Sequence, residues 1–102
     1  MTKINIMETF ILLPSTRKNK RYMVKTENKT IHFGSINHEN FTIHKDIERK
    51  ERYLKRHSKN EDWTDPLTAG FWSRWLLWTK PNLNESIKYI KKEFNIQVLN
   101  KL

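Results

Sequence analysis

Residues 68–78, Thr-Ala-Gly-Phe-Trp-Ser-Arg-Trp-Leu-Leu-Trp, hold three of the four tryptophans of a 102-residue chain. As a helix, this stretch is apolar almost all round, with only Ser73 and Arg74 on a narrow polar side, a pattern typical of buried helices. Hydrophobic residues make up only 36% of the chain, so a few bulky side chains must supply its core. We therefore expect a core role for the tryptophans rather than an exposed stacking platform. Arg74 is expected to pair with a nearby carboxylate or to stack on a tryptophan.

This stretch predicts a helix over about residues 68–78. Further helices are predicted on both sides of it. Downstream, Asn82 is a predicted N-cap with Glu85 at the capping-box position. Apolar residues then recur with helical spacing to Phe94, and residues 96–98 alternate like a closing strand. Upstream, a helix is predicted to start near residues 44–46 and to run to about His57, with acidic residues early and basic residues late.

The first third of the chain predicts strands. Residues 4–13 alternate like a first strand, and residues 21–26 and 30–33 read as a hairpin around residues 27–29. Residues 41–43 are expected to add a short extended piece. Strands followed by helices indicate an α+β fold, with a small N-terminal antiparallel sheet or hairpin packed on about three helices around an aromatic-rich core. The length predicts a single domain over 1–102, with residues 1–19 as an N-terminal extension.

Basic residues gather on one side of the upstream helix. At 100° per residue, four of them fall within about 40° of one another, and a fifth lies close by if the helix continues. This cationic ridge consists of Lys45, Arg49, Arg52, Arg56 and Lys59. The opposite side, predicted to face the core, carries Ile43, Ile47 and Leu54. The flanks offer the i,i+4 ion pairs Glu48–Arg52 and Glu51–Lys55.

The ridge admits three interpretations: the solvated face of an ordinary surface helix, a track for nucleic-acid phosphates, or a docking site for an acidic protein. The chain carries 20 Lys and Arg against 11 Asp and Glu, a net charge of +9, which favours affinity for polyanions. A second basic segment lies in the loop after the first strand. It consists of Arg17, Lys18, Lys20 and Arg21.

Several function classes are disfavoured. The chain has no Cys, which excludes disulfides, thiolate zinc sites and cysteine catalysis. Its four His lack metal-ligand spacing, and no phosphate-binding glycine loop or serine-nucleophile motif is present. A nuclease built on Asp46, Glu48 and Glu51 would need carboxylates that converge, whereas these point along different helix faces. We expect a protein that is not an enzyme and has no cofactor or metal. With no apolar run long enough to span a bilayer and no secretion signal, we expect it to be soluble, intracellular and not secreted.

Several segments of the chain form an unusual combination: residues 32–34, 42–46, 49–50, 52–53, 56–57, 61–63, 68–78, 80–81 and 86–87. Through these segments the chain resembles a family of small uncharacterised basic proteins of nucleocytoplasmic large DNA viruses. The resemblance covers roughly residues 20–95, and the hairpin turn departs from it, with Asn28-Lys29 where family members commonly carry Gly-Lys. The family supplies no catalytic residues. The resemblance implies a viral origin and a location in the virion or the infected-cell cytoplasm.

Three functions remain open. The first is a virion-associated structural protein that bridges acidic viral proteins or packaged nucleic acid through the cationic ridge and the basic loop. The second is a dedicated DNA- or RNA-binding module that acts through the basic helix. The third is a small metal-dependent nuclease.

Overall fold

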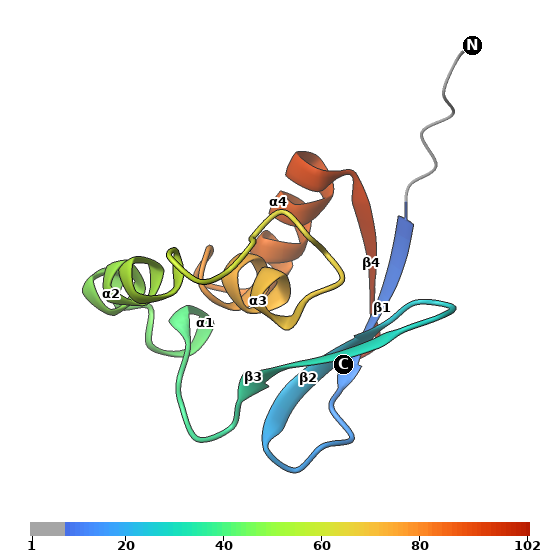
Figure 1. Ribbon diagram of the computed structural model, residues 1–102, viewed down its shortest axis with the longest axis horizontal. Helices are drawn as coiled ribbons and strands as arrows, with labels where there is room; N and C mark the ends of the chain where they lie inside the picture. Colours follow the sequence, from blue (N-terminus) through green and yellow to red (C-terminus); the bar gives the residue numbers. More distant parts are fainter. Residues whose placement is uncertain (1–7) are drawn as a thin grey trace.

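The structure is a computed structural model that describes residues 8–102. Four strands form one mixed sheet, and the helical residues 69–77 and 83–94 pack against one of its faces, so the fold class is α+β as predicted (Figure 1). The strands are β1 (Glu8–Pro14), β2 (Lys20–Lys25), β3 (Thr30–Ser35) and β4 (Ile96–Asn100). The predicted hairpin of β2 and β3 is confirmed, with Tyr22 opposite Phe33. Residues 4–7 of the predicted first strand lie outside the described residues.

The sheet has the order β3-β2-β1-β4. The pairs β3–β2 and β2–β1 are antiparallel, but β4 lies parallel to β1, with Thr9 opposite Gln97. Parallel neighbours need a long crossover connection, and here β2, β3 and all the helices lie between the two strands in sequence. The predicted closing strand is therefore confirmed, although the sheet is mixed rather than antiparallel.

Helical segments follow the hairpin, and most begin at a side-chain cap. Asn40, Asp46, Thr68 and Asn82 each accept hydrogen bonds from backbone N–H groups of the first turn that follows. The segments are α1 (Phe41–His44), α2 (Ile47–His57), α3 (Ala69–Trp72), the π-helical η1 (Ser73–Leu77) and α4 (Leu83–Phe94). Because η1 continues α3 directly, residues 69–77 form the one continuous helical stretch that the tryptophan-rich segment predicts.

The core lies between the sheet and the helical stretch 69–77, with α4 beside it. Trp72 is fully buried, its ring centroid lies 5.0 Å from that of Phe10, and its indole N–H donates to the carbonyl of Pro66. Trp75 is half-buried against the Phe94 ring, with centroids 5.1 Å apart. The tryptophans are thus core and core-edge residues. No helix within residues 8–102 has the length and apolar character needed to cross a membrane.

The sequence left open whether Arg74 pairs with a carboxylate or stacks on a tryptophan, and the structure shows stacking. Its guanidinium carbon lies 4.2 Å from the ring centroid of Trp75 and 5.3 Å from that of Trp63. It donates to the Thr79 hydroxyl and the Trp78 carbonyl rather than to a carboxylate. Burial lowers the pKa of Arg74. Arg74 therefore stacks on tryptophans and holds the end of η1, which gives it a structural role.

Two sequence predictions around the upstream helix are wrong. Residues 41–43 are not extended: Phe41 to His44 form the helical turn α1, capped by Asn40, whose side-chain oxygen accepts from Thr42 N–H. The predicted core side of α2 is also wrong at two of its three residues, because Ile47 is 63% exposed and Ile43 is 42% exposed, whereas Leu54 is half-buried. Tyr53 is buried instead. Its ring stacks on that of Trp78 with centroids 4.2 Å apart, so the side of α2 that carries Tyr53 faces the core.

Candidate nucleic-acid interface

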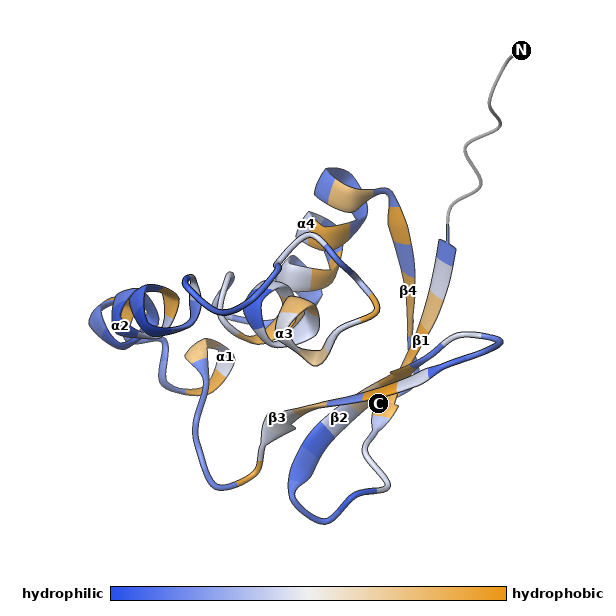
Figure 2. Cartoon of the chain, in the orientation of Figure 1, coloured by the Kyte–Doolittle hydropathy of each residue, from blue (hydrophilic) through white to orange (hydrophobic). Residues whose placement is uncertain are grey.

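Helix α2 lies farthest from the sheet and is the most hydrophilic helix (Figure 2). A groove with a volume of about 560 Å³ lies beside it. One wall belongs to α2, and the other comes from Lys20 of β2 and from residues of β3, α3 and η1. We call this the basic groove, after its cationic lining residues Lys20, Arg49, Arg52 and Arg56.

The structure brings together part of the predicted cationic ridge. Arg49, Arg52 and Arg56 lie on successive turns of α2 and line the basic groove. Arg49 is held by Glu39, with 3.3 Å between the guanidinium and the carboxylate oxygen. Arg52 and Arg56 are exposed, and neither belongs to an ion pair within residues 8–102. The predicted i,i+4 pairs on α2 are not formed, so these two arginines have no carboxylate partner in this part of the chain.

Lys59 and Lys45 lie differently. Helix α2 ends at His57, so Lys59 follows it and lines a second hollow together with Arg52, Lys55 and Arg56. Lys45 precedes α2 in a left-handed conformation with φ of 55°, its ammonium 3.4 Å from the Thr42 carbonyl. The ridge is therefore shorter than predicted. Lys55 lies on the same cationic surface, although its position four residues after Glu51 had predicted an ion pair on the flank of the helix.

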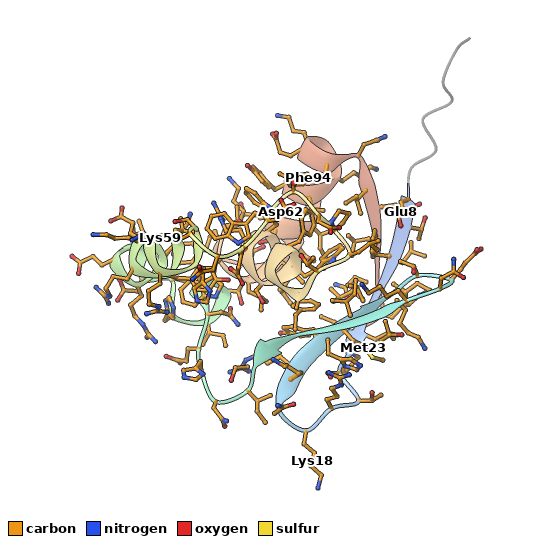
Figure 3. All side chains as sticks on the ribbon, viewed as in Figure 1. Glu8, Lys18, Met23, Lys59, Asp62 and Phe94 are labelled. Carbon is orange, nitrogen blue, oxygen red and sulfur yellow. The ribbon has the colours of Figure 1, made fainter. Side chains whose placement is uncertain are left out.

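The basic loop divides between two roles. Lys20 lines the basic groove, across from α2. Arg21 donates to the backbone carbonyls of Ser35 and His38, so it fastens the loop after β3. Arg17 and Lys18 are exposed, and Lys18 projects from the tip of the β1–β2 connection, away from α2 and Lys59 (Figure 3). Only Lys20 from the loop thus shares a surface with the arginines of α2.

Two carboxylates that the sequence analysis did not assign to the site lie in the basic groove. Glu39 pairs with Arg49. One oxygen of Glu61 accepts from the indole N–H of Trp63 at 3.1 Å and lies 3.3 Å from Nδ1 of His57. The other oxygen lies only 3.0 Å from the position that a Cβ on residue 70 would take. Gly70 thus leaves room for the Glu61 carboxylate in the groove wall, a contact that only the folded chain reveals.

An aromatic stack forms the inner side of α2. Tyr53 lies between His57 and Trp78, with ring centroids 4.3 and 4.2 Å away, and all three line the basic groove. Burial, followed by the nearby Glu61 carboxylate, raises the pKa of Tyr53 well above its usual range, so the phenol stays neutral. On the same helix, Lys50 donates to the Thr79 carbonyl at 2.9 Å, and burial lowers the pKa of Lys50. These contacts attach α2 to the core.

The carboxylates considered for a nuclease do not gather. The Asp46 carboxylate caps α2 by accepting from the N–H groups of Glu48 and Arg49. Within residues 8–102, no group of three or more His, Asp or Glu side chains is arranged to hold a metal ion.

Residues 10–57 match the model of a family of unknown function (DUF5754). No curated protein and no solved structure matches the chain. The family match covers β1 to α2, and thus most of the ridge and the basic loop, but not the tryptophan-rich segment. It includes residues 10–19, which the resemblance left aside.

Proposed function

We propose that the protein binds nucleic acid through the phosphate backbone and catalyses no reaction of its own. The observation that carries this proposal is the pair of exposed arginines on consecutive turns of α2, Arg52 and Arg56, which have no carboxylate partner within residues 8–102. Lys55 and Lys59 extend the same cationic surface. Like charges on neighbouring helical turns repel one another, and an external anion relieves that repulsion.

The chemistry of arginine favours phosphate as that anion. A guanidinium presents a planar fork of N–H donors that matches two oxygens of one phosphate. Phosphate contacts release counterions from the nucleic acid, so several cations along one helix add up to measurable affinity.

A structural role in the particle of a large DNA virus, bridging packaged nucleic acid, is one setting in which such a surface would act. That setting rests on the resemblance of the tryptophan-rich segment, which lies outside the family match over 10–57.

The test compares two triple variants that remove the same charge. Arg52→Gln, Arg56→Gln and Lys59→Gln neutralise the ridge, whereas Lys88→Gln, Lys91→Gln and Lys92→Gln neutralise exposed lysines of α4. Affinity for a labelled DNA strand of about 20 nucleotides is measured by fluorescence anisotropy at low salt. We expect the ridge variant to bind at least tenfold more weakly and the α4 variant to lose less than threefold.

Four outcomes would overturn the proposal. Equal losses in both variants would mean that net charge alone attracts DNA. Unchanged binding in the ridge variant, or no binding by the native protein, would leave an acidic protein as the partner of the ridge. Cleavage of the labelled strand in the presence of Mg²⁺ that is lost in Asp46→Asn would show a nuclease.

A further inference from the structure

The basic groove has the dimensions of a ligand site rather than of a surface track. Its volume of about 560 Å³ falls within the range of about 300–1,000 Å³ that is usual for small-molecule pockets. A nucleic-acid duplex is too wide to enter such a space, because its bases are stacked and paired. A single nucleotide that is free of pairing fits into it.

Cations lie on both sides of the groove. Arg52 and Arg56 come from α2, and Lys20 comes from β2 across the gap. No side-chain ion pair engages any of the three within residues 8–102. A phosphate that enters between these walls is therefore approached from two directions, whereas a phosphate on the outer side of α2 meets only one helix.

The carboxylate of Glu61 distinguishes a nucleotide from other anions. A bare phosphate offers no N–H donor to Glu61 and is repelled by it, and the carboxylates of an acidic peptide are repelled as well. A nucleobase carries exocyclic amino groups, and Asp and Glu side chains accept hydrogen bonds from such groups. A groove with cations at its walls and a carboxylate inside thus suits a ligand that is anionic at one end and an N–H donor at the other.

The aromatic stack offers a place for the base. Tyr53 has both ring faces covered, by His57 and Trp78. His57 ends the stack, and its side chain is 38% exposed. Bases stack on aromatic side chains without regard to sequence, at about 1–3 kcal/mol per base.

We infer that the basic groove holds one unpaired nucleotide of a single-stranded nucleic acid, with its phosphate between Arg52, Arg56 and Lys20 and its base beside His57 and Glu61. The inference rests on the proposed function and deepens it, since it makes single strands the preferred substrate class. Duplexes then contact only the outer surface of α2.

The test fills the groove without changing charge. Ala69 is exposed and lines the groove, so Ala69→Phe occupies it. Leu67→Phe is the matched control, because Leu67 is 41% exposed, lies two residues earlier and does not line the groove. Affinities for a 12-nucleotide DNA strand and for a DNA duplex of the same sequence are measured by anisotropy, and circular dichroism verifies that both variants are folded.

We expect the native protein to bind the single strand at least fivefold more tightly than the duplex. Ala69→Phe should remove that preference by weakening single-strand binding at least fivefold, with less than a twofold effect on the duplex, and Leu67→Phe should retain it. Equal affinity of the native protein for both DNA forms would overturn the inference, and so would full single-strand binding by folded Ala69→Phe. The proposed function survives either result if the ridge variant still binds weakly, so the two failures are distinguishable.

Discussion

Two glycines at the edge of the basic groove differ in what a methyl group would meet. Gly34 has φ of +79°, and a Cβ there would lie 3.0 Å from Cδ1 of buried Leu77. Gly34→Ala is therefore expected to lower the free energy of unfolding by about 1–2 kcal/mol, the usual cost of a left-handed conformation for an L-residue. Urea denaturation measures this loss. Gly70→Ala is the matched control, because it is helical and meets only the movable carboxylate of Glu61, and an equal loss there would contradict the explanation.

The lowered pKa of His44 makes the stability of the protein depend on pH. Burial, followed by the charge of Arg49, lowers its pKa below 6.5, and these effects outweigh Asp46 and Glu39, which raise it. The unfolded chain therefore binds more protons near this pH than the folded chain does. The stability that comes from the neutral imidazole is complete above pH 6.5 and is lost as the pH falls through 6.5 toward the lowered value.

We expect the urea midpoint of the native protein to decrease as the pH is lowered from about 7.5 to about 5.5. The midpoint of His44→Asn should decrease less over the same interval. Asn keeps an acceptor near the Asp46 N–H, to which Nδ1 of His44 is now bonded at 2.9 Å. His32, whose pKa is lowered by burial and then by Arg17 and Lys20, contributes in the same direction and remains in the variant. A pH dependence as steep in His44→Asn as in the native protein would rule out this assignment.

At the scale of elements, Tyr53 is the buried side chain by which α2 packs on the core, beside the Lys50–Thr79 hydrogen bond. Tyr53→Ala removes the ring that stacks between His57 and Trp78. Loss of a buried aromatic typically costs about 3–5 kcal/mol. Because α2 packs apart from the sheet, we expect amide exchange to accelerate most in residues 47–57 and least in the paired strands β1 and β2. Tyr53→Phe retains the stack and should exchange like the native protein, whereas uniform acceleration in Tyr53→Ala would show that α2 and the sheet unfold together.

Elements with strong local signals could be predicted from the sequence. Helix α4 has its cap at Asn82, and the hairpin turn closes with the Thr26 N–H donating to the Lys29 carbonyl. The inward side of α2 could not be predicted from its own pattern. Its apolar residues Ile47 and Leu54 suggested one face. The orientation is instead decided by stacking on Trp78, which lies 21 residues after His57, the last residue of α2.

The candidate site shows the same limit. The arginines of α2 are regularly spaced, so the sequence identifies them. Their groove also needs Lys20 from β2 and Glu61 beside Gly70, and nothing local relates these residues to α2. Charge spacing along a helix predicts a cationic surface, whereas the shape of a site depends on contacts between distant segments.

At the scale of the whole molecule, the net charge of +9 predicts binding that depends on salt. Four cations of the α2 surface that engage a single strand give a slope of log affinity against log salt of about −3, from about −0.7 per phosphate. The triple ridge variant should reduce the magnitude of this slope by about 2. Anisotropy titrations over several salt concentrations measure it, and a slope unchanged by the variant would place the phosphate contacts elsewhere.

The parallel pairing of β1 with β4 constrains the order of assembly. Phe10 lies opposite Val98, so one edge of β1 has no strand neighbour until residues 96–100 have left the ribosome. During synthesis, the hairpin of β2 and β3 can form early, while the open edge of β1 can pair with other nascent chains. The sheet can therefore be completed only after β2, β3 and all the helices between β1 and β4 have been synthesised.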